Sequence, residues 1–387
     1  MDRSKWEYKK LGEVSTMFSG FTPKSEELRS NGKYPYFKVA DMNTVGNERE
    51  LRYTISYIED SRKYFKKNTI VFPKNGAAIA TNKKRILAFD SIVDLNTAGI
   101  YADDSILSCL YLYYFLQNID FKEITRGGAV PTLDLKELRN RIINIPPISD
   151  QQRIVAELDC LNEMIAVKQE QLKEFDKLAQ SIFYDMFGDP MENSHGWKSE
   201  ILANIVSEDC SISYGIVQPG EDVEDGVPVV RPVDLTSTIV YRNGLKVVDK
   251  AISDSYRRTI LKGNEILFCV RGTTGIMSFA SEELKGCNVT RGITPLSFSE
   301  KVDKTYIYYL LMTPYLQSII AEKTNGIALK QINMRDVRLL PILLPPLALQ
   351  QQFADKISAI EAQKELVKQS IAETQALLSY TMDKYFG

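Results

Sequence analysis

Short loops that combine glycine with cationic, amide or hydroxyl side chains occur in both halves of the chain. The residues of interest in the first half are Lys74, Asn75, Gly76, Lys83, Lys84, Arg85, Thr125, Arg126, Gly127 and Gly128. Those in the second half are Arg271, Gly272, Thr273, Thr274, Arg291, Thr324, Asn325, Gly326, Lys330 and Gln331. Glycine lets backbone amides approach a phosphate closely, whereas Arg, Asn and Gln can make two hydrogen bonds to one base. Such loops are therefore candidates for gripping a nucleic acid.

Any one of these loops could instead be an ordinary hairpin turn. Two pairs recur at matching positions of the two halves, which favours a shared role. Thr125–Gly128 matches Thr324–Gly326, and Asn75-Gly76 matches Arg271-Gly272. Several tyrosines could stack on bases, but packing in the core is the better interpretation of them. These are Tyr34, Tyr36, Tyr113, Tyr114, Tyr308 and Tyr309.

The residue groups of common catalytic sites are missing from the sequence. His195 is the only histidine, so neither a multi-histidine metal site nor a Ser-His-Asp relay elsewhere is possible. No G-x-x-x-x-G-K-S/T phosphate loop occurs. The nearest string to the Asp/Asn-Pro-Pro-Tyr/Phe motif of an adenine methyltransferase is 144–148, which inserts a residue and lacks the aromatic. We therefore predict a chain without catalytic residues or a metal site of its own.

Length and composition indicate an ordinary globular protein of more than one domain. The chain has 387 residues, 44% of them hydrophobic and 25% charged. Five cysteines without a C-x-x-C pair, a start without an apolar signal segment, and apolar runs shorter than the ~20 residues of a membrane span predict a cytoplasmic protein. Charge is segregated: residues 1–145 carry a net +5 and residues 146–190 a net −5. Neither excess is large enough to predict a partner by itself.

One segment of the chain occurs twice, 199 residues apart. The first copy, "IPPISDQQRIVAELDCLNEMIAVKQEQLKEFDKLAQSIFYDMFG", aligns without a gap on "LPPLALQQQFADKISAIEAQKELVKQSIAETQALLSYTMDKYFG". Pro146-Pro147 falls on Pro345-Pro346, and Gln151-Gln152 falls on Gln350-Gln351. Because proline does not fit inside a helix, Pro-Pro marks a boundary, and Gly188 marks the other end. Each copy predicts a helix of about 34 residues, roughly 50 Å long.

Apolar residues recur in each copy with alternating steps of four and three, as in a heptad seam. Lys168 interrupts the seam in the first copy and Lys364 interrupts it in the second. A helix with such a seam needs a partner, which could be its own domain or a second molecule. The equal lengths favour pairing of the two helices within the chain. Since a whole domain separates them, we predict an intramolecular antiparallel coiled coil.

The segments that precede the two helices are also copies of each other. Aligned strings are "YPYFKVADM" (34–42) with "VPVVRPVDL" (227–235), "TIVFPKNGAAIA" (69–80) with "EILFCVRGTTGIM" (265–277), and "LYLYYFL" (110–116) with "TYIYYLL" (305–311). Short β-branched and aromatic runs alternate with turn residues, which predicts a β-rich α+β domain, and the tyrosine-rich strings predict one short buried helix each. The fold class is thus α+β: two such domains in tandem, each followed by a long helix. The expected parts are 1–145, 146–190, 191–343 and 344–387.

This order of domain, helix with "PP…QQ", domain and helix with "PP…QQ" resembles the specificity (S) subunit of Type I restriction-modification systems. The resemblance covers essentially the whole chain, and each domain, opening at Trp6 or Trp197, is similar to the family's target recognition domain. It implies that each domain reads one half of a split, asymmetric DNA sequence and that the helices set the length of the unread spacer.

The resemblance also implies partners and cofactors. The partners would be double-stranded DNA, two methyltransferase subunits docked on the helices, and restriction subunits held through them. S-adenosylmethionine is expected on the methyltransferase, and ATP and Mg on the restriction subunit, with no cofactor on this chain.

Two other functions stay open from the sequence. A self-contained DNA-modifying enzyme with unrecognised catalytic residues would transfer methyl groups by itself. A coiled-coil scaffold without a nucleic-acid role would retain no duplex, either alone or with a methyltransferase.

Overall fold

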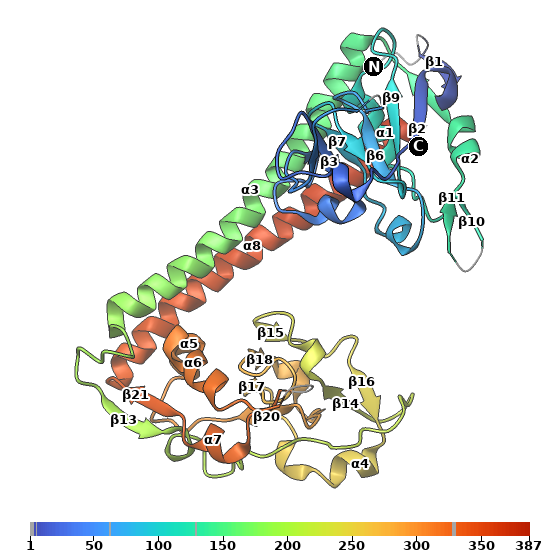
Figure 1. Cartoon of the computed structure of the whole chain (residues 1–387). Coiled ribbons are helices and arrows are strands. Elements are labelled where there is room, and N and C mark those ends of the chain that lie inside the picture. Colours follow the sequence, from blue (N-terminus) through green and yellow to red (C-terminus); the bar gives the residue numbers. More distant parts are fainter. Residues whose placement is uncertain (1–3, 5, 62, 128–129, 327–329) are drawn as a thin grey trace. The chain divides into compact units, whose positions relative to one another are not determined.

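The computed structural model describes residues 4, 6–61, 63–127, 130–326 and 330–387. By its internal contacts the chain divides into two compact units. The first unit comprises residues 1–169 and 368–387, and the second comprises residues 170–367. The end of the chain therefore packs with its first domain, and each long helix contributes one part to each unit (Figure 1).

In the first unit, short strands form a five-stranded sheet, order β2-β9-β6-β7-β4, and a three-stranded sheet, order β5-β3-β8. Two further pairs, β1 with β12 and β10 with β11, are antiparallel. The strands are β1 Glu7–Lys10, β2 Ser15–Ser19, β3 Tyr34–Phe37, β4 Glu50–Leu51, β5 Tyr57–Ile58, β6 Ile70–Pro73, β7 Arg85–Leu87, β8 Ile92–Val93, β9 Thr97–Ala102, β10 Thr125–Arg126, β11 Thr132–Leu133 and β12 Ile142–Ile145. The helices are α1 Cys109–Gln117, α2 Leu135–Asn140, the first part of α3 Ile148–Phe187 and the last part of α8 Leu347–Phe386.

The second unit repeats this plan with a four-stranded sheet, order β15-β18-β17-β20, and a three-stranded sheet, order β16-β14-β19. The pair β13 with β21 matches β1 with β12. The strands are β13 Lys198–Ile201, β14 Val227–Val230, β15 Ile239–Val240, β16 Lys246–Val248, β17 Ile266–Cys269, β18 Met277–Ala280, β19 Asn288–Val289, β20 Ile293–Leu296 and β21 Pro341–Leu344. The helices are α4 Lys250–Asp254, α5 Lys304–Met312, α6 Pro314–Glu322, α7 Met334–Arg338, the last part of α3 and the first part of α8.

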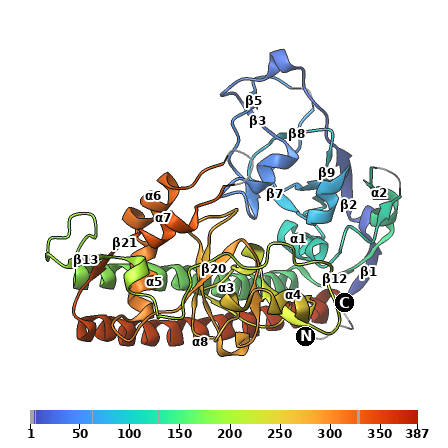
Figure 2. The ribbon, with the colours of Figure 1, turned by 90° about the horizontal axis from the view of Figure 1, so that it is seen from below.

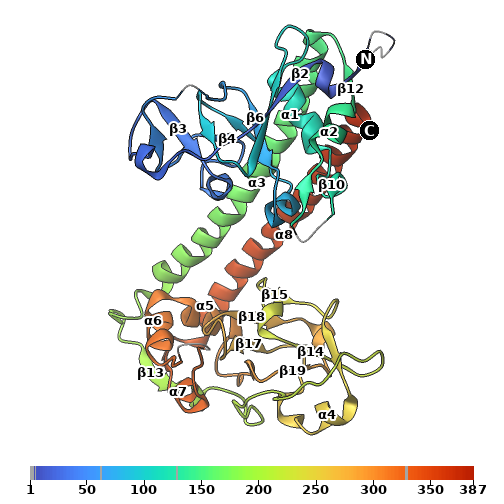
Figure 3. The same ribbon diagram turned by 45° about the vertical axis from the view of Figure 1, so that its right-hand side comes forward.

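The two tyrosine-rich strings form α1 and α5, short helices buried between a sheet and the long helices. In the first unit α1 lies against the two long helices (Figure 3). Its Tyr111 and Leu116 share a core with Leu158 of α3 and Met382 of α8. In the second unit α5 packs in the same way on α3 and α8 (Figure 2). The prediction of one short buried helix per domain is confirmed, as is the α+β class of both domains.

Each long helix has 40 residues, so the predicted length of about 34 was too short. The helices begin directly after the Pro-Pro pairs because a proline restricts the residue before it and leaves the following residues free to be helical. The Nε2 of Gln151 donates to the oxygen of Pro146 at 2.9 Å, and Gln350 donates to Pro345 at 2.8 Å. Gly188, with φ +75°, ends α3 as predicted.

Within each unit the contacts between α3 and α8 run antiparallel. In the first unit the Tyr385 hydroxyl donates to Glu157 at 2.7 Å, and Lys168 donates to the Thr374 hydroxyl at 2.8 Å. In the second unit Lys364 donates to Asp176 at 2.8 Å. As residue numbers rise along α3, those of its partners on α8 fall, which is the orientation predicted from the sequence. The lysines that interrupt the seam are thus hydrogen-bonded across the helix pair.

Candidate nucleic-acid interface

In the first unit, two of the predicted loops lie against each other. Asn75 pairs with Thr132 in an antiparallel bridge, and Thr132 pairs with Arg126 in the β10–β11 hairpin. The amide of Gly76 donates to the oxygen of Pro131 at 2.8 Å. The chain therefore forms a small three-stranded ladder that places Asn75, Thr132 and Arg126 in one row.

The second unit contains the same ladder built from different side chains. Arg271 and Asn325 each pair with Gln331 in antiparallel bridges. The amide of Gly272 donates to the oxygen of Lys330 at 2.8 Å, as Gly76 does to its partner. Here the row is Arg271, Gln331 and Asn325. The structure thus brings together the loops whose recurrence the sequence showed.

Gly76 and Gly272 are needed for their backbone conformation rather than for space. Their φ angles are +76° and +90°, and a Cβ built on either would have no neighbour within 4 Å. Because L-residues rarely adopt such angles, glycine lets the chain turn out of β6 and β17 into the ladder.

Arg126 is exposed and held in place by a carboxylate. Its Nε donates to Asp134 at 2.6 Å, and 65% of its side chain is accessible to solvent. The pair raises the pKa of Arg126 and lowers the pKa of Asp134, so both groups stay charged. Asp134 also caps α2 by accepting from the amides of Lys136 and Glu137. The guanidinium is therefore anchored by one edge to the start of a helix.

Arg271 occupies the other edge of its row and is partly buried. Its Nε is buried and has no hydrogen-bond partner among the residues that the structure describes. Next to it, Gln331 donates to the Tyr214 hydroxyl at 3.0 Å, and the guanidinium of Arg291 lies 5.8 Å from the Tyr214 ring. Tyr214 thus joins two of the predicted residues into one cluster, although no sequence pattern had singled it out.

The threonines of the predicted loops hold backbone or one another. The Thr324 hydroxyl bonds to that of Thr274 at 3.1 Å, and Thr125 donates to the oxygen of Lys122 at 3.0 Å. Gly128 lies outside the residues that the structure describes. The other loop residues are exposed: Gly127, Thr273, Gly326 and Lys330.

Lys84 does not reach the surface. Its Nζ donates to Asn82 at 2.7 Å and to the oxygen of Ile119 at 2.8 Å, and it lies 4.1 Å from the centre of the Phe121 ring. Burial lowers its pKa to about 7. This placement does not fit a phosphate contact, so we leave Lys84 out of the proposed surface. Its neighbours are partly exposed, and Arg85 donates to the oxygen of Met42 at 3.2 Å.

The tyrosines considered for base stacking lie in the core or against the long helices. Tyr34 and Tyr36 are buried in the three-stranded sheet, and the Tyr114 hydroxyl donates to Asp159 of α3. Tyr309 packs edge-on against Phe353 of α8 with ring centres 5.3 Å apart. These contacts agree with core packing rather than with base stacking.

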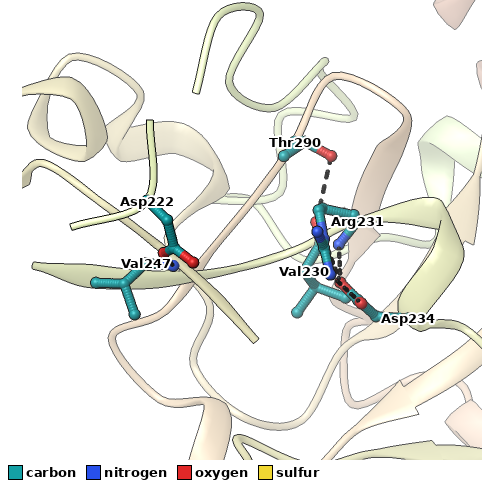
Figure 4. A network of polar contacts seen from close by, with 6 residues as sticks. All are labelled: Asp222, Val230, Arg231, Asp234, Val247 and Thr290. Carbon is teal, nitrogen blue, oxygen red and sulfur yellow. Dashed lines mark hydrogen bonds and ion pairs between the residues drawn. The ribbon is translucent and has the colours of Figure 1, made fainter. Parts of the chain in front are cut away.

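A basic residue that was not among the predicted site residues, Arg231, follows strand β14. The amide of Arg231 donates to Asp234 at 2.7 Å, and its guanidinium forms an ion pair with the same carboxylate at 2.9 Å (Figure 4). The oxygen of Val230 accepts from the amide of Thr290, the residue before Arg291. Two cations of the second unit are therefore tied to neighbouring strands.

The first unit repeats this arrangement with a lysine. The amide of Lys38 donates to Asp41 at 2.7 Å, and the oxygen of Phe37 accepts from the amide of Asp94 at 3.0 Å. One feature of the sequence could have identified these two cations. In the alignment of "YPYFKVADM" with "VPVVRPVDL", Lys38 falls on Arg231 and Asp41 falls on Asp234.

Two further findings concern the part of the chain that the structure describes. In it, no group of three or more His, Cys, Asp or Glu side chains could hold a metal ion. Nor does any of its helices have the length and hydropathy needed to cross a bilayer.

Both copies in the chain match one known protein family. The family model described as "Type I restriction modification DNA specificity domain" matches residues 3–176 and 219–376. The chain belongs to this family. The resemblance inferred from the repeated helices is thereby confirmed, and the two matched ranges correspond to the two copies.

Named relatives agree with the family. The chain is 23% identical over 381 residues to the Type I restriction enzyme MjaVIII specificity subunit of Methanocaldococcus jannaschii, covering 92% of this chain and 86% of that protein. It is 22% identical over 271 residues to the EcoBI specificity subunit of Escherichia coli, covering 64% of this chain. That match spans 57% of the length of the E. coli protein.

Solved structures show the same fold at low sequence identity. The S subunit of a Type I restriction-modification system from M. genitalium matches with a TM-score of 0.52 and 16% identity, over 99% of this chain and 96% of that one. A chain from a structural study of assembly and conformational transition of the type I R-M system matches with a TM-score of 0.58 and 18% identity, over 99% and 97%. The specificity-domain chain therefore shares their architecture.

Proposed function

We propose that this chain is the specificity subunit of a Type I restriction-modification complex and that each unit binds one half of a bipartite, asymmetric DNA sequence. As a DNA specificity-domain protein, it selects the DNA and leaves the chemistry to its partners. The observation that carries the proposal is the ladder that both units share. One scaffold presents two different sets of side chains, which suits two different half-sites. The sets are Asn75, Thr132 and Arg126, and Arg271, Gln331 and Asn325.

The ladder has dimensions suited to a DNA groove. Neighbouring strands lie about 4.8 Å apart, so a row of three side chains spans roughly 10 Å. The major groove of B-DNA is about 12 Å wide and admits a β-ribbon. Positive charge that could neutralise phosphates comes from four cations. Lys74 directly precedes Asn75, and Arg291 lies over the Tyr214 ring, whose hydroxyl accepts from Gln331. Lys38 and Arg231 follow residues that hydrogen-bond to Asp94 and Thr290. Side chains of the row then contact base edges while these cations hold the backbone.

The long helices would set the distance between the two half-sites. Each is a continuous helix of 40 residues, or about 60 Å at 1.5 Å per residue, with parts in both units. A helix pair of fixed length and register gives a spacer of fixed length. The bases within the spacer need not be contacted.

Exposed apolar residues on the two helices support docking of two methyltransferase subunits. In the first unit Val167 is 61% exposed and Leu377 is 51% exposed. In the second unit Leu366 is 58% exposed and Leu178 is 46% exposed. Val167 lies 199 positions before Leu366, and Leu178 lies 199 positions before Leu377, so the two patches are equivalent. Two like partners, each covering one patch, fit this repetition better than a single partner does.

The partners would carry the cofactors. S-adenosylmethionine belongs on the methyltransferase subunits, ATP and Mg belong on restriction subunits held through them, and the complex acts on DNA in the cytoplasm.

Selection from a library of random duplexes tests the proposal. The purified chain, with its methyltransferase partner, is expected to enrich one bipartite sequence with a constant spacer, and with S-adenosylmethionine the complex should methylate it. The chain alone should transfer no methyl group. Methyl transfer by the chain alone, or no retention of duplex with or without the partner, would overturn the proposal.

A further inference from the structure

The two reading rows contain the same pair of base-reading residue types at opposite edges. In the first unit asparagine is at the edge that follows β6 and arginine is in the hairpin. In the second unit arginine follows β17 and asparagine is in the hairpin. Asn75 corresponds to Arg271, and Arg126 corresponds to Asn325, which lies 199 positions further on. The side chains have exchanged places on a common scaffold.

Residues paired across strands project to the same face of a ladder, so the members of each row can approach one ligand together. In the first unit the middle residue, Thr132, is exposed and the next residue, Leu133, is buried. In the second unit Ile332, which follows the middle residue Gln331, is fully buried. The alternation shows that each row lies on the face turned away from the core.

The helix-capping residue near each hairpin differs between the two units, as the hairpin residue does. In the first unit this residue is Asp134, whose carboxylate accepts from the Nε of Arg126 at 2.6 Å. At the same place in the second unit stands Asn333, which keeps the capping role by accepting from the Asp336 amide at 3.0 Å. Only the unit with a hairpin arginine has the carboxylate. Capping the helix alone does not require a carboxylate, since Asn333 does it without one. We therefore match the negative charge of Asp134 to the guanidinium of Arg126.

Each arginine has hydrogen-bonding capacity to spare. Among the residues that the structure describes, the Arg126 guanidinium bonds only to Asp134, through Nε, which leaves the two terminal nitrogens for a ligand. For Arg271 the Nε itself is buried without a partner in the described part of the chain. A buried, unsatisfied donor calls for a ligand or an ordered group at that site. A pair of donors in a fixed fork matches the O6 and N7 acceptors on the major-groove edge of guanine.

We infer that Arg126 reads a guanine in the first half-site and Arg271 a guanine in the second, while Asn325 and Asn75 at the opposite edges read adenine. Asp134 is a positioning residue that aims Arg126. The inference rests on the proposed function and specifies which bases the two units recognise.

Replacing Arg126 with glutamine tests the first assignment, since glutamine prefers adenine and keeps a long side chain. Selection from random duplexes by the full chain with its methyltransferase partner should show one guanine of one half-site losing its preference, by about 5- to 150-fold, with adenine favoured in its place. Lys136→Gln removes the same charge from an exposed position nearby and serves as the control. It should leave every base preference unchanged.

A chemical probe in the DNA tests the same contact without changing the fold. Replacing the assigned guanine with 7-deazaguanine removes the N7 acceptor. Wild-type binding should weaken at least about 5-fold, whereas binding by the Arg126→Gln variant should change less than 2-fold. Equal losses for both proteins would overturn the assignment.

Asp134→Asn copies the neutral cap that the second unit already uses, so α2 should remain folded. The variant should lose part of the guanine preference at the position assigned to Arg126 and keep all other preferences, and melting curves should match the wild type. A loss of stability with unchanged base preference would show that Asp134 is merely structural and would contradict its positioning role. If the wild type selects no bipartite sequence, the proposed function fails as well. If it does select one and Arg126→Gln leaves it unaltered, only this inference fails.

Discussion

A glutamine at the start of each long helix gives the repeated "PP…QQ" string its structural role. Gln151 is fully buried, accepts from the amide of Ser108 at 2.8 Å and donates to the oxygen of Ile106 at 2.8 Å. Gln350 is buried in the same way and accepts from the amide of Asp303 at 2.9 Å. Ser108 and Asp303 are the caps of α1 and α5. Each glutamine thus ties the start of a long helix to the start of a short buried one.

Gln151→Ala should lower the free energy of unfolding by about 1–3 kcal/mol, because it leaves the Ser108 amide without a partner. Gln152→Ala is the matched control, since that side chain is exposed, and it should change stability by less than about 0.5 kcal/mol. Urea unfolding of both variants measures the difference. Equal effects would show that the buried hydrogen bonds do not stabilise the domain.

Lys84 should make stability depend on pH. Its pKa is about 7 in the folded chain because burial disfavours the charge, whereas an exposed lysine titrates near 10.5. Between these values the unfolded state binds a proton that the folded state does not, so stability should rise as pH increases from 7 towards 10. The slope contributed is up to about 1.4 kcal/mol per pH unit.

Lys84→Met should remove this contribution, and Lys83→Met, on a partly exposed neighbour, should retain it. Urea unfolding at pH 7, 8 and 9 compares the three proteins. If wild type and Lys84→Met show the same slope, the lysine is not neutralised by burial.

Among the elements, the pairing of α3 and α8 contains a buried charge that can be tested. The Lys364 side chain is 9% exposed and forms ion pairs with Asp176 at 2.8 Å and Glu361 at 2.7 Å. Lys364→Met removes the buried charge and should leave stability unchanged or raise it by up to about 1–4 kcal/mol. The double change Asp176→Ala and Glu361→Ala leaves the lysine without either partner and should cost about 3–5 kcal/mol. Urea unfolding that ranks the two variants the other way would contradict this account.

The elements also show which features a sequence can predict. Heptad spacing and the Pro-Pro pairs were sufficient to predict two long helices, because helix seams follow a local period. The domain between the helices predicted their antiparallel orientation. The ladder was predictable only in part. The recurrence of Asn75-Gly76 and Arg271-Gly272 pointed to the right loops, but their bridges to Thr132 and Gln331 join residues about 60 positions apart in the chain. No local pattern specifies such a pairing.

The burial and the contacts of single polar residues could not be predicted from the sequence either. Lys84 lies in a basic run that is typical of a surface loop. Its partners, however, are Asn82 in a nearby turn and Ile119 in the bend that follows α1. No sequence pattern connected Asp134 with Arg126, because their contact depends on how the β10–β11 hairpin folds back on the start of α2. Lys38 and Arg231 share an alignment position, but neither was predicted to belong to the site.

For the whole molecule, the proposed role of the helices predicts a change in spacer length. Inserting seven residues after Gln169 and seven after Lys368 adds one heptad at equivalent places and preserves the seam. The added length is about 10.5 Å, or about three base pairs at 3.4 Å each. Sequencing of methylated sites in cells with the partner subunits should show a spacer longer by about three base pairs and unchanged bases in both halves. An altered half-site, or an unaltered spacer, would contradict the ruler role.

The division of labour between the two units is the central claim, and one measurement tests it most directly. The complexes that carry Arg126→Ala and Arg271→Ala are each used to select duplexes from the same random library. The account predicts that the first variant relaxes base preference in one half-site only and the second relaxes it in the other half only. If either variant changes both halves, or if both variants change the same half, the two units do not read separate halves of one sequence.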